Sequence, residues 1–274
     1  MLDKQYLLNT KQMAQFVAGG YLRFDDLVPR ELCKAAHKYI DEGLTHQGTE
    51  DLTGTSFAEV HPPNSPLKEI FELPNVRGVI ESLLGPNPEF DHHYAHKTKP
   101  GQFFSDDLHQ DAQYDSRQTH FDIQISFFPQ DVTEEMGGTL IVPGSHFRRV
   151  HESALRRYQN IIGQIQTVCE AGCMIFWHHN LWHSARSNKS DRTRYMYKLR
   201  LNPKGSQTLC WNTDDIDDPK IKKILKRRQP WFGEEARVEF INRAKLWRYL
   251  TGNPDFDIDY YLTRDSMDNR VGAR

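Results

Sequence analysis

Three histidines fall within six residues of the segment FWHHNLWHSARSN, which runs from residue 176 to residue 188. They are His178, His179 and His183, and a neutral imidazole is the commonest metal ligand in proteins. A lone histidine is weak evidence for a site, because most of the 13 histidines in this chain are expected at the surface or hydrogen-bonded in the core. A functional histidine therefore needs partners from elsewhere in the sequence.

Two His-x-Asp pairs can supply such partners. His109 and Asp111 stand in LHQDAQYD, and His120 and Asp122 stand in THFD. Residues i and i+2 of a strand point to the same face, so either pair can present an imidazole and a carboxylate to one ion. A second histidine from a distant strand would complete a two-histidine, one-carboxylate set, which leaves positions open on iron for a co-substrate and dioxygen. Spacing alone leaves the choice between the two pairs open.

The segment HSARSNKSDRTR contributes both a histidine and an arginine. Arg194 follows His183 by eleven residues and opens a predicted strand after the polar turn SNKSD. In a barrel, this spacing can place the imidazole at the metal and the guanidinium deeper in the same cavity. A guanidinium recognises a carboxylate through two parallel hydrogen bonds. The pattern therefore predicts 2-oxoglutarate, held by iron at one end and by Arg194 at the other.

The elements that must position these residues form three segments of one domain. Residues 1–88 predict a helical N-terminal segment, because VPRELCKAAHKYIDEGL and SPLKEIFELPNVRGVIESLLG carry apolar residues at helical spacing between proline and glycine boundaries. Residues 89–202 predict a core of short antiparallel strands, in which HFDIQISFF alternates apolar and polar residues. Residues 203–274 predict a helical extension that packs on the core or on a second subunit. Its apolar stripe is Ala236, Phe240, Ala244 and Trp247.

Composition narrows the class of function. The chain has 274 residues and a net charge of −2, with acidic and basic residues mixed, so nothing indicates a nucleic-acid or membrane-surface partner. No cationic and apolar leader and no run of 18 apolar residues is present, and we expect a soluble cytoplasmic protein acting on a small molecule. The four cysteines, which include the pair Cys169 and Cys173, are interpreted as free thiols.

Taken together, the motifs resemble those of the phytanoyl-CoA dioxygenase family of Fe(II)/2-oxoglutarate oxygenases. The resemblance rests on LHQD, GGTLIVPGSH, AGCMIFWHHNLWH and SNKSDRTR, and it spans roughly residues 10–202. It implies a mainly β protein with flanking helices around a double-stranded β-helix, the jelly-roll core of the cupins. It also implies Fe(II), 2-oxoglutarate and O2 as cofactors. Oxidative decarboxylation to succinate and CO2 would be coupled to hydroxylation of an unactivated C–H bond.

The resemblance also implies roles for individual residues. The metal ligands and catalytic residues would be His109, Asp111 and His183. His120 and Asp122 then become ordinary strand residues. His178 and His179, which lack an arginine at the family's spacing, are expected to line or cap the mouth of the barrel, or to face the substrate.

One position departs from the family's pattern. Many relatives place a serine two residues after the distal histidine, where it helps to hold the oxoglutarate carboxylate, and this chain has Ala185 there. Candidates for this role are Tyr94, His96 and Lys99, of which Tyr94 is preferred. Asp111 is retained, whereas related halogenases have alanine or glycine at that position, so hydroxylation is the expected outcome.

The identity of the substrate is not predicted. Arg194, Met196, Lys198 and Arg200 share a face by strand alternation, so Lys198 either faces the cavity and favours an anionic or polar substrate, or lies in solvent at the end of the strand. Two other classes of function remain open. One is a cupin-like metal-dependent hydrolase or isomerase, which has no need of Arg194. The other is a catalytically silent jelly-roll binding module, which would be free to lose a metal ligand. A homodimer is also open.

Overall fold

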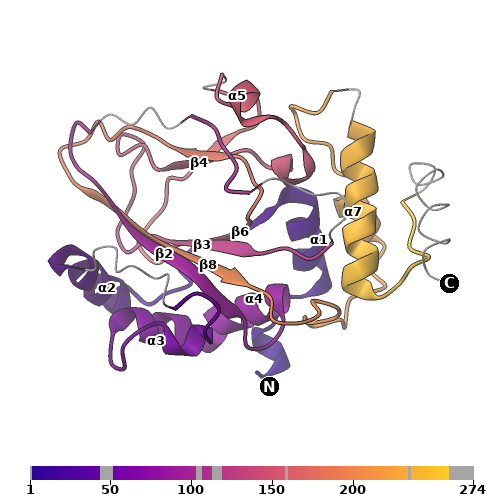
Figure 1. The fold of residues 1–274 in the computed structure, drawn as a ribbon, viewed down its shortest axis with the longest axis horizontal. Helices are drawn as coiled ribbons and strands as arrows, with labels where there is room; N and C mark the ends of the chain where they lie inside the picture. The colour runs from indigo at the N-terminus through magenta and orange to yellow at the C-terminus, as the bar shows by residue number, and fades with distance from the viewer. Residues whose placement is uncertain are drawn as a thin grey trace.

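Two antiparallel sheets form the centre of the molecule, and helices lie around them (Figure 1). The structure, a computed structural model, describes residues 2–43, 52–102, 107–112, 119–157, 160–233 and 236–258. In the view of Figure 1, α2, α3 and α4 lie below the larger sheet, and strand β4 of the smaller sheet lies above it. This is a jelly-roll core with flanking helices, as predicted.

The larger sheet has five strands in the order β1-β6-β3-β8-β2, and every neighbouring pair is antiparallel. Its strands in this order are β1 (Tyr21–Phe24), β6 (Met174–His178), β3 (Ile123–Phe127), β8 (Arg194–Asn202) and β2 (Glu89–Thr98). The smaller sheet has the order β5-β4-β7, also antiparallel. Its strands are β5 (Ile165–Gln166), β4 (Thr139–Ile141) and β7 (His183–Ala185).

Side-chain alternation gives the larger sheet two different faces. The apolar positions of β3 belong to the core shared with the helices and are fully buried; they are Ile123, Ile125 and Phe127. Gln124 and Ser126 point to the opposite face, where Gln124 lies opposite Trp177 in β6 and Ser126 lies opposite Lys198 in β8. Trp177 and Lys198 line a cavity on that face. The predicted alternation therefore separates an apolar side under the helices from a polar side that faces the cavity.

The described part of the N-terminal segment contributes four α-helices and also one strand. Gly43 ends the second helix as predicted, and Ser65 caps the third by accepting a hydrogen bond from the Lys68 N–H. Strand β1 falls between the first two helices and pairs with β6, so part of this segment belongs to the larger sheet. The helices are α1 (Thr10–Gly19), α2 (Arg30–Glu42), α3 (Pro66–Glu72) and α4 (Pro74–Leu84).

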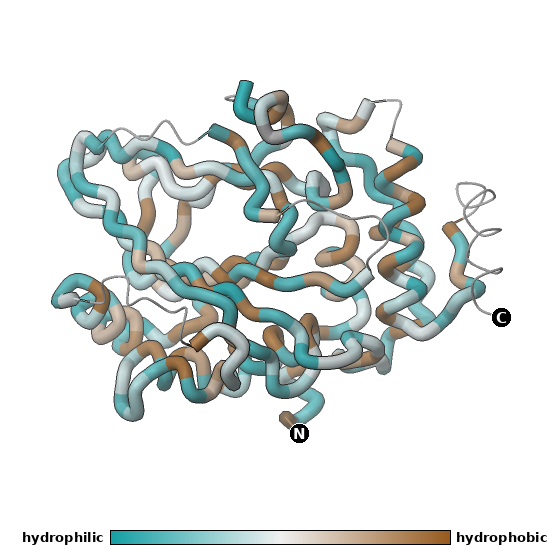
Figure 2. Tube along the Cα trace, viewed as in Figure 1, coloured by the Kyte–Doolittle hydropathy of each residue, from teal (hydrophilic) through white to brown (hydrophobic). Residues whose placement is uncertain are grey.

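The C-terminal segment contains α6 (Lys220–Leu225) and α7 (Ala236–Thr251). The predicted stripe of α7 is at most 2% exposed and joins the main core; it consists of Ala236, Phe240, Ala244 and Trp247. Helix α7 packs against α1 and α6 of the same chain, and the Trp247 ring lies 6.0 Å from the Trp211 ring. Hydrophobic and hydrophilic positions are interleaved along α7 in Figure 2. The stripe is thus buried within the chain.

Four shorter elements complete the described chain: η1 (Lys4–Tyr6), η3 (Phe57–Glu59), η4 (Ser145–Phe147) and α5 (Glu152–Leu155). No helix in the described ranges is long and apolar enough to cross a membrane. The four cysteines are free, as predicted.

Gly137 and Gly138 bring the chain into the smaller sheet at a point of very close backbone approach. Both have positive φ angles, of 84° and 63°. A Cβ at Gly137 would lie 2.4 Å from the carbonyl oxygen of Ser187, and one at Gly138 would lie 2.2 Å from that of Thr167. Only glycine fits this turn without strain. The turn places the carbonyl group of Met136 next to Arg194, the first residue of β8, whose Nη1 group donates a hydrogen bond to it.

Candidate metal centre

Three side chains converge on one point between the two sheets. His109 and His183 lie side by side, since each backbone N–H donates to the other's carbonyl oxygen at 3.0 Å. Asp111 completes the group: its Oδ1 lies 3.6 Å from His109 Nε2, and its Oδ2 lies 3.7 Å from His183 Nε2. All three potential ligand atoms lie within 4.8 Å of one another, and within the described part of the chain this is the one such cluster.

Backbone carbonyl groups hold both imidazoles in the orientation that a metal requires. His109 Nδ1 lies 2.9 Å from the carbonyl oxygen of Asp107, and His183 Nδ1 lies 2.8 Å from that of Leu181. A carbonyl oxygen only accepts, so we assign the proton of each ring to Nδ1. Each Nε2 lone pair is then directed towards Asp111, which is the usual arrangement of a metal-binding histidine.

The charges of the cluster suit a divalent cation. Burial alone would raise the pKa of Asp111, but His183, Lys198 and His109 nearby, together with a hydrogen bond from Gln124, lower it to about 2. Burial lowers the pKa of His183 to about 4, against the opposing effect of Asp111. At neutral pH the aspartate is therefore ionised and His183 is neutral, which are the protonation states that bind metal.

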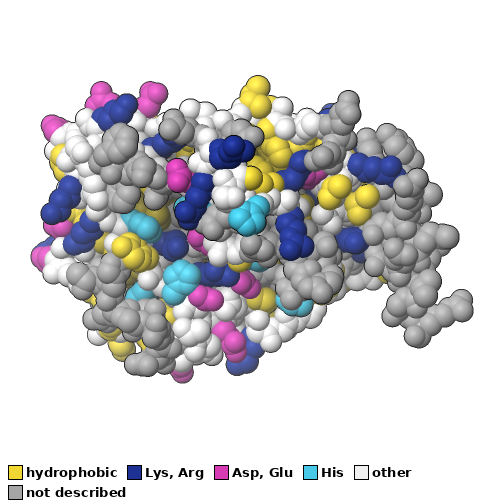
Figure 3. Space-filling model, turned by 45° about the horizontal axis from the view of Figure 1, so that its top comes forward, with side chains coloured by type: hydrophobic (Ala, Val, Ile, Leu, Met, Phe, Trp, Pro, Cys, Tyr) yellow, Lys and Arg dark blue, Asp and Glu magenta, His cyan; other side chains and the backbone are white. Residues whose placement is uncertain are grey.

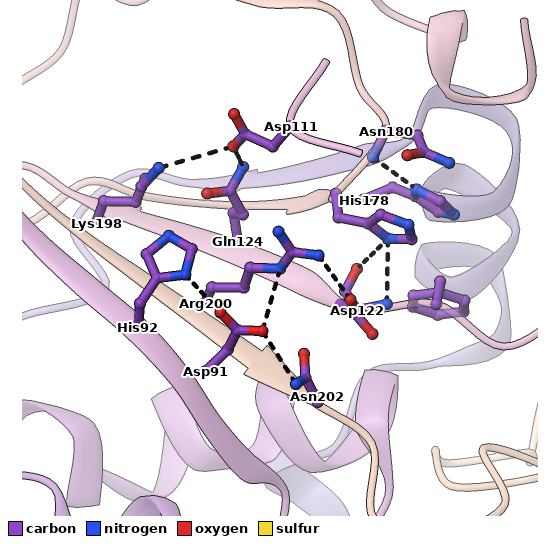
Figure 4. A network of polar contacts seen from close by, with 12 residues as sticks. Asp91, His92, Asp111, Asp122, Gln124, His178, Asn180, Lys198, Arg200 and Asn202 are labelled. Atoms are coloured by element: carbon purple, nitrogen blue, oxygen red, sulfur yellow. Dashed lines mark hydrogen bonds and ion pairs between the residues drawn. The ribbon is translucent and has the colours of Figure 1, made fainter. Parts of the chain in front are cut away.

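Gln124 and Lys198 surround the carboxylate of Asp111 (Figure 4). The Gln124 Nε2 group donates a hydrogen bond to Asp111 Oδ2, and the Lys198 Nζ lies 3.7 Å from the same oxygen. The sequence analysis did not assign Gln124 to the site. The sequence did carry one signal for Gln124, which is its place among the polar positions of the alternating segment HFDIQISFF.

A cavity of about 100 Å³ joins the metal cluster to Arg194. Figure 3 shows histidine side chains close to basic and acidic side chains on one face of the molecule. The cavity is lined by His96, Thr98, His109, Thr139, Trp177, His183, Ser184, Ala185, Arg194, Met196 and Lys198. The cavity wall therefore includes both imidazoles of the cluster and two basic side chains, Arg194 and Lys198.

Arg194 is 6% exposed and is held in place by the chain around it. Its Nη1 donates to the carbonyl oxygens of Met136 and, at 2.9 Å, of Arg186, and its Nη2 donates to Thr98 Oγ1 at 3.2 Å. Thr98 was not among the residues that the sequence analysis considered as helpers of the arginine. It lies on the same face of β2 as the candidates Tyr94 and His96.

The preferred candidate, Tyr94, lies opposite Lys198 in the register of β2 and β8. Its side chain is 39% exposed, its ring lies 4.3 Å from that of His96, and within the described chain the cavity wall includes His96 but not Tyr94. Lys99 follows β2 in the turn, where its N–H donates to Gln102 Oε1 at 2.9 Å. Of the two candidates within β2, His96 lies nearer than Tyr94 to Thr98.

His178 and His179 lie apart from the three potential ligands. His178 ends β6 on the apolar face, 3% exposed, with its ring stacked 5.3 Å from Phe121. His179 Nδ1 accepts a hydrogen bond from the N–H of Asp122 at 3.2 Å. The carboxylate of Asp122 accepts from Arg200 Nη2 at 2.9 Å, so it is engaged away from the cluster.

The donor set fits a non-haem iron centre. Two imidazoles and one carboxylate on one side of an ion would leave the opposite positions open, as in the facial triad of Fe(II) oxygenases. The buried guanidinium of Arg194 in the same cavity suits the distal carboxylate of 2-oxoglutarate. His109, Asp111 and His183 would hold the iron, and Arg194 with Thr98 would hold the co-substrate.

Fold and site together define a jelly-roll protein with a candidate two-histidine, one-carboxylate metal centre. The phytanoyl-CoA dioxygenase (PhyH) family profile matches residues 16–196, and the chain belongs to this family. No curated protein sequence matches it.

Three solved structures illustrate the likeness in fold. HygX from Streptomyces hygroscopicus, with nickel and 2-oxoglutarate bound, is 12% identical, with a TM-score of 0.56 over 72% of this chain and 88% of HygX. EctD from S. alaskensis, in its apoform, is 18% identical, with a TM-score of 0.53 over 70% of this chain and 76% of EctD. SnoN, a non-haem α-ketoglutarate-dependent epimerase from nogalamycin biosynthesis, is 16% identical, with a TM-score of 0.50 over 71% of this chain and 83% of SnoN. All three share the arrangement of the core.

Proposed function

We propose that this protein is an Fe(II)- and 2-oxoglutarate-dependent dioxygenase that hydroxylates an unactivated C–H bond of a small-molecule metabolite and releases succinate and CO2. One observation carries the proposal. The imidazoles of His109 and His183 and the buried guanidinium of Arg194 line one cavity, and the carboxylate of Asp111 faces both imidazoles. Membership of the phytanoyl-CoA dioxygenase family supports the same reaction class.

The protein's own residues bind and orient the reactants. His109, Asp111 and His183 would hold Fe(II) on one side, and Arg194 would hold the distal carboxylate of 2-oxoglutarate. When bound, iron and 2-oxoglutarate supply the activation of O2 and the oxidising power for the C–H bond. Gln124 would help to orient the carboxylate of Asp111 through its hydrogen bond.

The cavity walls limit the access of water to the reaction. Trp177 is 1% exposed and its ring lies 5.0 Å from that of His183, so an apolar surface covers one side of the metal cluster. Excluding water strengthens the electrostatic interactions of Arg194 and protects a reactive site from side reactions. Asp111 would be the third ligand of the iron, where related halogenases have alanine or glycine, so the retained carboxylate favours hydroxylation over halogenation.

Other functions are distinguished by the same residues. A metal-dependent hydrolase or isomerase would have no use for a buried arginine beside its metal, and a silent binding module would have no reason to keep three ligands with both imidazoles oriented. Stereochemical inversion is a further outcome of 2-oxoglutarate chemistry, since the related fold of SnoN belongs to an epimerase.

Turnover of 2-oxoglutarate tests the proposal directly. The purified protein, loaded with Fe(II) without oxygen and then exposed to O2, should convert 2-oxoglutarate into succinate and CO2 even before a substrate is known. Protein loaded with Zn(II) serves as the control and should form no succinate. A metabolite screen should then find compounds that accelerate succinate formation, and mass spectrometry of the product should show the gain of one oxygen atom. A product of unchanged mass would indicate epimerisation, and absence of succinate would refute the proposal.

A further inference from the structure

Strand β8 carries three basic side chains on its cavity-facing side, at Arg194, Lys198 and Arg200. The two arginines have hydrogen-bond partners outside the metal cluster. Arg194 donates to two carbonyl groups and to Thr98, and Arg200 donates to Asp122 at 2.9 Å and lies 3.8 Å from Asp91 (Figure 4). These contacts give both arginines hydrogen-bond acceptors without any metal, and Arg200 also has carboxylate partners.

Lys198 has a different environment. Its side chain is 19% exposed, and its Nζ lies 3.7 Å from Asp111 Oδ2, which is longer than a charge-assisted hydrogen bond. Across the described ranges, its three N–H donors have no hydrogen-bond acceptor, and Asp111 is its one carboxylate partner. A largely buried ammonium is costly unless it is paired. Among the described residues, the one anionic partner of Lys198 is thus a residue whose charge a metal ion would share.

With Fe(II) and 2-oxoglutarate bound, the net charge of the cavity would favour the binding of a further anion. Arg194 and Lys198 are the cations that line the cavity, and Asp111 is the carboxylate beside them. Fe(II) brings two positive charges and 2-oxoglutarate brings two negative charges. One positive charge then remains uncompensated, and the nearest charges dominate in a cavity of low dielectric. The uncompensated charge lies at Lys198, because Arg194 pairs with the co-substrate.

Lys198 lies far along β8 from Arg194, which would bind the distal carboxylate of 2-oxoglutarate. A strand rises about 3.3 Å per residue, so the Cα atoms of Arg194 and Lys198 lie roughly 13 Å apart along β8. A 2-oxoglutarate molecule that joins Arg194 to the metal occupies the part of the cavity on the Arg194 side. Lys198 lies at the metal end, where a substrate must also approach.

We infer that Lys198 binds an anionic group of the primary substrate, and that this substrate is a carboxylate, sulfonate or phosphate. The inference rests on the proposed function and adds a substrate class to it. Lysine suits this role because its ammonium acts as a point charge on a flexible stem and adapts to anions of different shape. When the anion binds, it supplies the hydrogen-bond acceptors that the ammonium lacks among the described residues.

Fragment binding tests the inference without knowledge of the full substrate. The Fe(II)–2-oxoglutarate protein is titrated without oxygen with acetate, methanesulfonate and methylphosphonate, and with methylammonium as the cationic probe, by calorimetry. Wild type should bind the anions, and Lys198→Met should bind them about tenfold or more weakly, the range for a hydrogen bond to a charged group. Lys198→Arg should keep most of the affinity, and Lys198→Glu should prefer methylammonium. Lys204→Met is the matched control, because the Lys204 side chain is 65% exposed and pairs with Glu89.

The outcomes separate this inference from the proposed function. Succinate formation by wild type without added substrate reports on the proposed function alone. If succinate forms but the anions bind to Lys198→Met as tightly as to wild type, the inference is wrong and the function stands. If Lys198→Met instead loses affinity for 2-oxoglutarate while keeping its affinity for the anions, Lys198 serves the co-substrate and the inference is overturned. Thermal unfolding of each variant confirms that the comparison is made between folded proteins.

Discussion

Replacing Arg194 by alanine should weaken the binding of 2-oxoglutarate roughly a hundredfold or more. The side chain is 6% exposed and lines the cavity, so its pairing with a carboxylate is largely protected from water. A hydrogen bond to a charged group contributes about 1.5–3 kcal/mol, and leaving one partner of a buried pair alone can cost about 3–5 kcal/mol. Since each 1.4 kcal/mol corresponds to about a tenfold change in affinity, a hundredfold loss corresponds to about 2.8 kcal/mol, close to the lower end of the range for a broken buried pair.

The structure also predicts a stability cost that must be separated from the binding effect. Arg194 donates to the carbonyl oxygens of Met136 and Arg186 and to Thr98 Oγ1, and the alanine variant leaves these acceptors without it. Each buried acceptor left unsatisfied can cost about 1–3 kcal/mol. Arg194→Lys keeps the charge without the planar fork, so it should restore only part of the affinity.

The assay is an anaerobic titration of the Fe(II)-loaded protein with 2-oxoglutarate, with thermal unfolding of each variant measured alongside. Fe(II) affinity should change little, because Arg194 is not among the three potential ligands. Arg192→Ala is the control, since Arg192 is exposed in the turn before β8 and its alanine variant should behave like wild type. Unchanged 2-oxoglutarate affinity in a folded Arg194→Ala protein would refute the assignment of the arginine to the co-substrate.

Three further predictions concern the metal centre, the C-terminal segment and a buried histidine. Asp111→Ala should abolish turnover and weaken Fe(II) binding, while Asp122→Ala should keep the iron; the opposite pattern in a metal titration would contradict the assigned site. Truncation after Gly205 removes α6 and α7 and exposes the core that they cover. Light scattering should then show aggregation, or calorimetry a lower Tm. A soluble, fully active truncated protein would count against a structural role of this segment. Burial, with smaller effects of His93 and Lys68, lowers the pKa of His61 from 6.5 to about 3. Between these two pH values only the unfolded state takes up this proton, so the free energy of unfolding falls by roughly 1.4 kcal/mol per pH unit as the pH falls below 6.5. In urea unfolding, His61→Phe should therefore lose less stability than wild type between pH 6.5 and pH 5. Equal losses in the two proteins would disprove the idea.

Several features of the fold followed from local patterns. The alternation of HFDIQISFF predicted which side chains of β3 enter the apolar core, because neighbouring side chains of a strand must point to opposite faces. The end of α2 at Gly43 and the cap of α3 at Ser65 were also readable, since capping depends on a few adjacent residues. The burial of the α7 stripe was predicted from its spacing, but its partners α1 and α6 were not.

Strand β1 was not predicted, because the sequence analysis assigned its residues to a helical N-terminal segment. Its four residues, Tyr21–Phe24, carry no strong strand pattern, and they pair with β6, whose residues are far away in the sequence. The stability of such a short strand comes from its hydrogen bonds to β6 and from the burial of Leu22 against the core. Neither partner can be recognised from the strand itself.

The sequence by itself determined the chemical types in the site and most of their spacing: two imidazoles, one carboxylate and a basic residue that begins β8. Only the tertiary structure decided that Thr98 contacts Arg194 and that Gln124 and Lys198 both approach Asp111. The register between β2, β3 and β8 sets these contacts, and a shift of one residue would turn each side chain to the other face. Register depends on how residues far apart in the chain pack together, so it cannot be read from any one segment.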